Sequence, residues 1–397
     1  MRSTDVSSRE PIRTRGRATI VGAAVASLAA GAALLPTWSA AAADAAAPAV
    51  DAGTRATFQR LADAVFTDRT NALVTGERSA KPLTDGFSGD VRLSADTARD
   101  EDAALAALDR RKDRLARLGE TYRTADTTVT LNATRVTGRT AKATVTETTT
   151  LTYDKVRGDE SGDEPRTTGF QARHELTFTA DRRGDWQLTA IRDTDRGIAV
   201  NTLAKPSVKA PTVDDTMPSA PRAATTYPAP AKPKTLTGTA LNYRAMATYA
   251  EKYWRTYNKD YPDFDGQGAG GDCTNFVSQS LKAGGWKHVP GYVYDYTRWF
   301  GNAEIQSHSF IGVNEWSWFA QNSKRTTSLA NVYQMDVGDV LQIDFDKDGS
   351  KDHTMIVTYR SPQGVPYLTY HSNDTYRRSL SSIIASYRTS AYYAYRT

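Results

Sequence analysis

The segment GQGAGGDCTNFVSQSL, residues 266–281, decides how the second half of this chain is interpreted. Its first six residues are rich in glycine, and the residues from Cys273 onward have a helical character that stops at Gly284 and Gly285. Cys273 therefore opens a predicted helix directly after a loop whose backbone can approach another molecule closely. Backbone N–H groups at such a helix end stabilise a thiolate and can also hold an oxyanion.

Cys273 is the single cysteine in 397 residues, so it cannot form a disulfide within the chain. In an exported protein, a leftover cysteine is either a reactive thiol or a link to another chain. A buried structural cysteine is the alternative interpretation. The position after Gly-Gly-Asp, at the start of a helix, favours a nucleophile whose pKa lies below the usual value of ~8.5.

A thiolate nucleophile needs a base, which is usually a histidine oriented by a third group. His353 is well placed for this role because it ends an acidic loop, residues 344–352, and begins the strand-like run HTMIVTY, residues 353–359. The pattern therefore predicts Cys273 as nucleophile and His353 as base.

The third group is predicted from the register of a hairpin. A second strand follows the first after a five-residue turn. If Arg360 pairs with Pro366, counting back along both strands places His353 opposite Asn373 on the same face. His371 lies on that face two residues away and is the alternative third member, and a bulge would change this register.

The acidic loop resembles the first half of a calcium-binding loop. Asp344, Asp346 and Asp348 stand at its first, third and fifth positions, and Asp352 at its ninth. Its twelfth position is Met355 and not the bidentate glutamate that completes such a loop. We interpret the segment as an acidic turn between two strands. Asp344, Asp346 and Asp348 are kept as a calcium candidate, and no cofactor is expected.

Aromatic residues are dense between the nucleophile and the base. Alternating aromatics suit a half-buried strand, and each ring either packs in the core or lines a substrate groove. The residues concerned are Tyr292, Tyr294, Tyr296, Trp299, Trp316 and Trp318.

The first 43 residues have the pattern of a signal peptide. Five arginines precede an Ala- and Leu-rich run at residues 18–35, and small residues follow at 39–43. A membrane anchor is the alternative, because 18 apolar residues approach the length that spans a bilayer, but alanine inserts weakly. We predict a secreted, extracellular protein without stable membrane insertion after cleavage.

The remaining chain divides by pattern into three parts. Residues 51–200 show two helical segments and then four strand-like segments, which predict a smaller α+β domain of unknown role. Residues 201–236 are rich in proline and predict an extended linker. Residues 237–397 predict a catalytic domain. His174, in the first domain, is interpreted as a packing or surface residue.

Charge excludes one class of partner. The chain has 50 Lys and Arg against 45 Asp and Glu, a net charge of +5. Nucleic-acid binding calls for a concentrated basic face with stacking aromatics, and the sequence contains no such pattern. We therefore expect no nucleic-acid partner, and the oligomeric state stays open.

From about residue 242 to 395 the chain resembles the putative amidase domain family of Gram-positive bacteria, which is related to the papain-like and NlpC/P60-like peptidases. The motifs that carry the resemblance are YAEKYW (249–254), GDCTNFVSQ (271–279), GDV (338–340), Asp348-Gly349 leading to His353, and YHSN (370–373). The resemblance implies that Cys273 and His353 form the catalytic pair and that Asn373 orients the histidine. Gln267 lies six residues before Cys273, the offset of the oxyanion-hole glutamine in papain-like enzymes.

The resemblance implies an α+β papain-like fold in which the helix that bears Cys273 packs on an antiparallel sheet. It also implies a cysteine-dependent amide hydrolase whose substrate is an amide or peptide. Since we expect secretion, envelope or peptidoglycan-type amide bonds are the expected targets. A non-catalytic envelope-binding module and an acyl transferase that uses the same Cys–His pair are the alternatives.

Overall fold

The computed structural model describes residues 50–75, 92–157, 166–195, 198–203, 217, 220–237, 240–265 and 271–397. The predicted signal peptide, Gln267 and residues 204–216 of the predicted linker lie outside this part. Residues 47–397 form one compact unit. None of the helices in the described ranges has both the length and the apolar character needed to cross a membrane.

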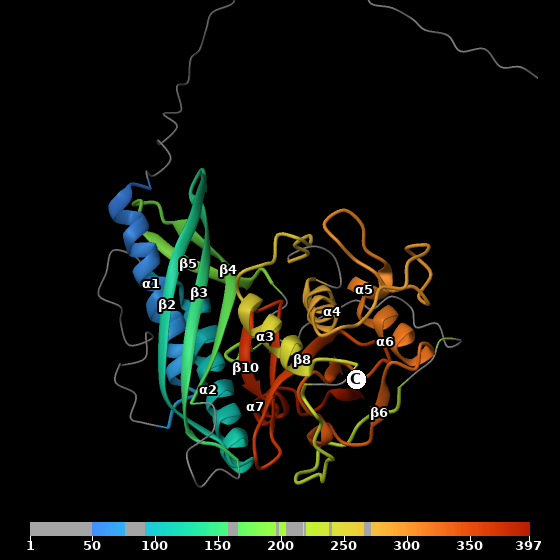
Figure 1. Ribbon diagram of the computed structural model, residues 1–397. Helices are drawn as coiled ribbons and strands as arrows, with labels where there is room; N and C mark the ends of the chain where they lie inside the picture. The colour runs from blue at the N-terminus through green and yellow to red at the C-terminus, as the bar shows by residue number, and fades with distance from the viewer. Residues whose placement is uncertain are drawn as a thin grey trace, which may run out of the picture. The chain divides into compact units, whose positions relative to one another are not determined.

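Two long helices and a set of curved strands come first in the chain. They are α1 (Ala52–Asn71), β1 (Arg92–Leu93), α2 (Ala95–Arg117), β2 (Thr121–Thr137), β3 (Thr140–Lys155), β4 (Thr167–Ala180) and β5 (Trp186–Asp193). Asp51 caps α1 by accepting the Thr54 N–H at 2.7 Å, and Ser94 caps α2 by accepting the Thr97 N–H at 3.2 Å. Figure 1 shows α1 lying along the strands β2 and β3.

Shorter elements follow from residue 240 onward. They are α3 (Tyr243–Tyr253), α4 (Cys273–Ala283), α5 (His308–Ile311), α6 (Val313–Asn322), β6 (Thr327–Leu329), a 3-10 helix (Val332–Gln334), β7 (Val340–Asp344), β8 (His353–Arg360), β9 (Pro366–Tyr370), β10 (Thr375–Ser379), α7 (Leu380–Ser386) and β11 (Ala391–Arg396). The protein is thus α+β. The predicted helix at Cys273 and the predicted strand at His353 both begin at the expected residues.

One mostly antiparallel sheet joins both groups of elements. Its order is β1-β5-β4-β10-β9-β8-β7-β11-β6, with β2 pairing to β3 and β3 to β4. The two groups meet where β10 pairs with β4, in the register Thr375 to Phe170 and Tyr376 to Gly169. The division into a first domain, a linker and a catalytic domain stays a prediction, since the described residues on both sides share this sheet.

Successive residues of β8 face opposite sides of the sheet and separate two cores. Ile356 belongs to a cluster with Phe276 and Val277 of α4. Val357 belongs to another cluster, with Leu380 of α7. Because side chains alternate along a strand, α4 and α7 cover opposite faces of the sheet. The helix that carries Cys273 therefore packs on an antiparallel sheet.

A buried charged cluster lies in the first group of elements. His174 of β4 is 3% exposed and stacks on Phe66 at 4.1 Å between ring centroids. Its Nδ1 lies 2.8 Å from Asp193 Oδ1 and its Nε2 3.2 Å from Glu147 Oε2. Both nitrogens face acceptors, so the imidazole is charged. Burial by itself would lower the pKa of His174, but the hydrogen bonds to Asp193 and Glu147 raise it to about 9.

This cluster predicts a pH-dependent stability. The folded pKa lies above the model-peptide value of 6.5, so its contribution is complete below pH 6.5 and is lost as the pH rises through 9. The difference corresponds to about 3 kcal/mol of unfolding free energy. Urea unfolding between pH 6 and 9.5 should show this decline in the wild type and not in His174→Gln. Parallel curves for the two proteins would contradict the assignment.

Candidate functional site

Cys273 is the first residue of α4, and its side chain is fully buried. Gly271 precedes it with φ +52°, a backbone conformation that glycine adopts without steric cost. The first turn of α4 has no side-chain cap. This start of α4 is the end of the helix at which N–H groups point outward and partial positive charge accumulates.

Asp272, immediately before Cys273, anchors the start of α4. Its Oδ1 accepts hydrogen bonds from Asn275 Nδ2 at 2.7 Å and from the Phe264 N–H at 3.2 Å. Its Oδ2 lies 2.5 Å from His371 Nδ1. The carboxylate is 1% exposed, and these bonds offset the cost of burying it.

His371 serves as the second half of that anchor. Its Nε2 lies 2.9 Å from the carbonyl oxygen of Tyr253, and the ring is stacked by Tyr257 and Phe276 at 4.2 and 4.0 Å. Because Nδ1 and Nε2 both face acceptors, the imidazole carries a positive charge. Burial by itself would lower the pKa of His371, but the hydrogen bond to Asp272 and the charge of Asp374 raise it. His371 therefore links the end of α3, at Tyr253, to the start of α4, at Asp272.

His353 is the first residue of β8, and it lies next to a residue that contacts α4 directly. Thr354 Oγ1 lies 2.8 Å from Thr274 Oγ1, so the residues that follow Cys273 and His353 are joined by a hydrogen bond. The His353 ring is 1% exposed and meets Tyr370 edge-on at 5.1 Å. The fold thus brings the chain at the predicted nucleophile next to the chain at the predicted base.

The predicted hairpin register is correct at its end and wrong further along. Arg360 pairs with Pro366 as expected. A bulge between Val357 and Tyr359 then shifts the pairing by one residue, and β9 ends at Tyr370. The predicted pairing of His353 with Asn373 is therefore absent, because β9 stops before Asn373 and a one-residue slip exchanges the faces of a strand.

Asn373 lies in the turn between β9 and β10. Its backbone has φ +78°, which asparagine tolerates better than most residues, and it is 2% exposed. Its Oδ1 accepts a hydrogen bond from the N–H of Ile198, a residue that precedes the predicted linker. Asn373 Nδ2 has no hydrogen-bond partner among the described residues.

Asp374, the next residue, is also buried. Its Oδ1 accepts a hydrogen bond from the Tyr257 hydroxyl at 3.0 Å. Burial raises the pKa of Asp374 to about 6, while the charges of His371 and Arg173 and the Tyr257 hydrogen bond act in the opposite direction. The turn that carries the predicted third residue is therefore a dense polar region held from several sides.

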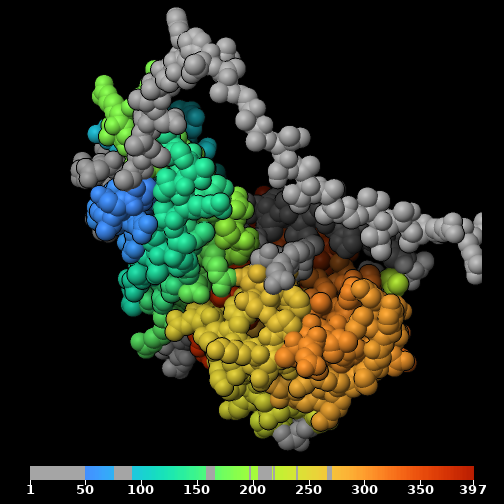
Figure 2. All heavy atoms as spheres, turned by 90° about the horizontal axis from the view of Figure 1, so that it is seen from above, coloured from blue at the N-terminus to red at the C-terminus, as the bar shows by residue number. Residues whose placement is uncertain are grey.

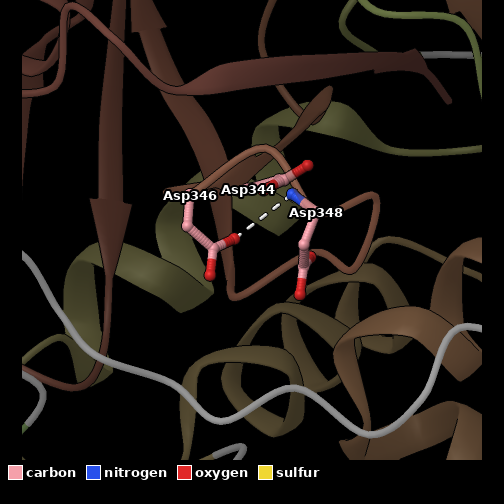
Figure 3. Close-up of side chains that lie close together, drawn as sticks. All are labelled: Asp344, Asp346 and Asp348. Carbon is pink, nitrogen blue, oxygen red and sulfur yellow. Dashed lines mark hydrogen bonds between the residues drawn. The ribbon is translucent and has the colours of Figure 1, made fainter.

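Three carboxylates lie close together in the acidic loop before His353 (Figure 3). Asp344, Asp346 and Asp348 each offer an oxygen within 4.8 Å of the others, and Asp344 is buried. Their oxygens also accept backbone N–H groups: Asp344 from Lys347 and Gly349, and Asp346 from Asp348.

These bonds are those of an acidic turn. Asp352 follows and accepts the Phe345 N–H at 2.7 Å; burial and the neighbouring carboxylates raise the pKa of Asp352 to about 7. Met355, at the twelfth position, is a buried residue of β8. The calcium candidate stays a sequence-based prediction.

The aromatic residues between Cys273 and His353 differ in burial, and Tyr296 and Trp318 are partly exposed. Trp299 and Trp316 are fully buried in the core beside α4, while Tyr292 and Tyr294 are 69% and 62% exposed. The expected half-buried strand is absent, since the described segment around Tyr294 has no regular strand. Figure 2 shows residues of the 240–320 range, coloured yellow to orange, gathered in the lower part of the face in view.

Comparison with known proteins finds a family that part of the chain matches. Residues 240–395 match the family described as "Putative amidase domain". The match covers the C-terminal part of the chain and includes α3, α4 and the strands β6–β11. Residues 240–395 are called the amidase domain below, after the family that they match.

Two relatives each match over about a third of this chain. The uncharacterized protein YhbB of Bacillus subtilis (strain 168) is 30% identical over 146 residues, which are 36% of this chain and 45% of that protein. The uncharacterized protein YjcM of the same strain is 31% identical over 144 residues, 35% and 34% of the two chains. This chain thus spans less than half of either relative. No solved structure matches it significantly.

Sequence reasoning missed two contacts of the amidase domain. Asp272 stands beside Cys273 in the sequence, and an acidic residue before a buried helix start could have suggested a buried partner such as His371. The contact of Ile198 with Asn373 gave no local signal, because the two residues are far apart in the sequence and one contributes only its backbone.

Proposed function

We propose that this protein is a secreted, papain-like cysteine amide hydrolase in which Cys273 is the nucleophile, His353 the base and Asn373 the orienting residue. The match to the amidase domain supports amidase-like hydrolase chemistry. One geometric observation supports the assignment of residues, because it brings the start of α4 next to the start of β8. Cys273 begins α4, and the adjacent Thr274 is hydrogen-bonded to Thr354, the neighbour of His353.

The proposed reaction follows from these positions. The Cys273 thiolate attacks the carbonyl carbon of the amide, and N–H groups at the start of α4 stabilise the oxyanion. The protonated His353 gives its proton to the departing amine as the C–N bond breaks. His353 then takes a proton from water, the resulting hydroxide attacks the acyl-enzyme, and the carboxylic acid leaves as the thiolate is restored.

We propose peptidoglycan-type or other envelope amides as substrates, with export directed by residues 1–43. The support is the predicted signal peptide, because an exported bacterial hydrolase would encounter amide bonds of the cell envelope. A screen of soluble wall fragments, with new amines and acids identified by mass, would test this part. Appearance of a transferred acyl group on an added amine would favour the acyl transferase instead.

The assignment of Cys273 and His353 is tested by alkylation with iodoacetamide across pH 5–10 in the full chain. We expect a midpoint at least about one pH unit below the ordinary ~8.5 of a free thiol, and a shift toward 8.5 in His353→Ala. The midpoint is the diagnostic quantity because burial of Cys273 slows the reaction at every pH.

His288→Ala is the matched control, since His288 is an exposed histidine of the same domain. Its midpoint should equal that of the wild type. An ordinary midpoint in the wild type, unmoved by His353→Ala, would indicate a structural cysteine and favour the envelope-binding module.

A further inference from the structure

Residues 198–202 are buried although they belong to the connection between the curved strands and the amidase domain. Their exposed fractions do not exceed 5%. Connecting segments usually run over the surface, because buried backbone needs a partner for each polar group. A buried connection therefore implies that other parts of the molecule supply those partners.

Two buried arginines hold the carbonyl groups of this segment. Arg378 of β10 donates to the Ile198 carbonyl at 2.9 Å. Arg111 of α2 donates to the carbonyls of Val200 and Thr202 at 2.5 and 2.6 Å. A buried guanidinium is costly unless its N–H groups are satisfied, so both arginines depend on the segment as much as it depends on them.

The segment is also tied to the charged cluster around His174. Asn201 Nδ2 donates to Glu147 Oε1 at 2.8 Å, and Glu147 Oε2 faces His174. The position of residues 198–202 is therefore set by α2, β3 and β10 together.

At its first residue the segment contacts the predicted third member of the catalytic group. The Ile198 N–H donates to Asn373 Oδ1. If the Asn373 amide were flipped, its Nδ2 donor would face the Ile198 N–H donor, which is unfavourable. This contact therefore fixes the orientation of the Asn373 amide. The other end, Nδ2, has no partner among the described residues. Within the described part of the chain, the orientation of the Asn373 amide thus rests on Ile198.

Asn373 combines two features that do not favour stability. Its backbone is left-handed at φ +78°, and a buried amide donor without an acceptor costs about 1–3 kcal/mol. Such departures from local preference occur mainly at functional positions. An amide oxygen has two lone pairs, so one remains for an imidazolium N–H after the Ile198 bond is made.

We infer that the backbone N–H of Ile198 is a positioning group of the catalytic centre, which orients the Asn373 amide for its proposed role toward His353. This inference rests on the proposed function. It makes residues 198–202 a component of the active site although they lie outside the amidase domain.

Strand β4 supports the same turn from a second direction. The Gln171 N–H donates to the Asp374 carbonyl at 2.8 Å, and Phe170 pairs with Thr375. Arg173, also on β4, forms an ion pair with Asp265 near the start of α4. Residues before the amidase domain therefore reach both the turn of Asn373 and the loop that leads to Cys273.

The test compares Ile198→Pro with Ile198→Val in the full chain. The two side chains are similar in size, but only proline removes the N–H. The measured quantity is the pH midpoint of iodoacetamide alkylation of Cys273. We expect the midpoint of Ile198→Pro to lie at least about one pH unit above that of Ile198→Val, in the direction of ~8.5. General destabilisation changes the rate at all pH values and not the midpoint.

Hydrogen exchange of the Ile198 amide provides a second readout. Protection should persist in Asn373→Asp, which keeps an acceptor oxygen, and should fall at least tenfold in Asn373→Gly, with amides of β8 as the internal reference. This readout decides the matter if Ile198→Pro does not fold.

The outcomes separate the inference from the proposed function. A wild-type midpoint of Cys273 alkylation near pH ~8.5 would contradict the proposed function itself, whatever the Ile198 variants show. A low wild-type midpoint with identical values for Ile198→Pro and Ile198→Val overturns the inference alone. Equal Ile198 exchange in Asn373→Asp and Asn373→Gly also overturns it.

Discussion

A fragment that begins at Ala220 is expected to lose cooperative folding, although it contains the whole amidase domain. One continuous core includes Tyr122, Leu151, Tyr153 and Phe170 from the first group of elements together with residues of β8, β9 and α7. Each large apolar side chain contributes about 1.5–3 kcal/mol when buried. Loss of these four partners, about 6–12 kcal/mol in total, is as large as the roughly 5–15 kcal/mol that stabilises a typical domain.

The same cut would expose a strand edge. Without β4, the strand β10 becomes an edge with unpaired N–H and carbonyl groups, which promotes aggregation. Polar contacts would also be lost, such as Glu120 Oε2, which accepts the Ser379 hydroxyl at 2.5 Å, and Arg114 Nε, which donates to the Ala385 carbonyl at 2.8 Å.

Thermal unfolding and the alkylation profile of Cys273 are the measurements for this fragment. The matched control is the full chain with a protease site placed in residues 204–216 and then cut. The cut protein should keep both properties, because the contacts and not the connection hold the two portions together. A fragment with a sharp unfolding transition and the full-chain midpoint would contradict the prediction, and faster alkylation in the fragment would indicate autoinhibition.

Replacement of Arg378 by methionine is expected to destabilise the protein by about 3–5 kcal/mol. Arg378 is fully buried and donates to the Ile198 carbonyl, the Tyr370 hydroxyl at 3.1 Å and the Ser386 hydroxyl at 2.6 Å. Methionine fills part of the volume but leaves these acceptors without donors. Arg378→Lys should recover only part of the loss, because one ammonium cannot match a planar fork of donors.

Arg377 provides a control on the same strand. It forms a two-point ion pair with Glu251 at 2.6 and 2.9 Å, and both side chains are partly exposed. Ion pairs near the surface contribute about 0–1 kcal/mol, so Arg377→Met should cost far less than Arg378→Met. Urea unfolding measures both. Equal losses of unfolding free energy in the two variants would show that the buried hydrogen bonds of Arg378 stabilise the protein no more than the partly exposed ion pair of Arg377.

Local sequence patterns were sufficient for the elements that carry the predicted chemistry. Glycine before Cys273 and a Gly-Gly pair after the helix define α4, and the turn of residues 361–365 aligns Arg360 with Pro366. These features depend on residues within a few positions of each other. Helix starts, helix stops and short hairpins are therefore accessible to sequence reasoning.

Features that depend on distant partners were not accessible. The bulge near Val357 shifts the strand pairing by one residue, so the side chains beyond the bulge face the side opposite to the one expected. No residue type in the strand indicates that a bulge is present. The pairing of Asp272 with His371 joins positions almost one hundred residues apart, and the contact of Ile198 with Asn373 uses a backbone atom. Sequence periodicity describes which face of an element is apolar, but it does not say which other element covers that face.

The pairing of β4 with β10 also bears on how the chain reaches its native state. Phe170 of β4 pairs with Thr375 of β10, which is synthesised some 200 residues later. The two strands can therefore pair only after most of the chain has been made. Contacts of such large sequence separation slow folding, and an unpaired strand left open in the meantime is prone to pair wrongly. Until the second half of the chain has been made, the edge of β4 that later pairs with β10 is open to such wrong pairing.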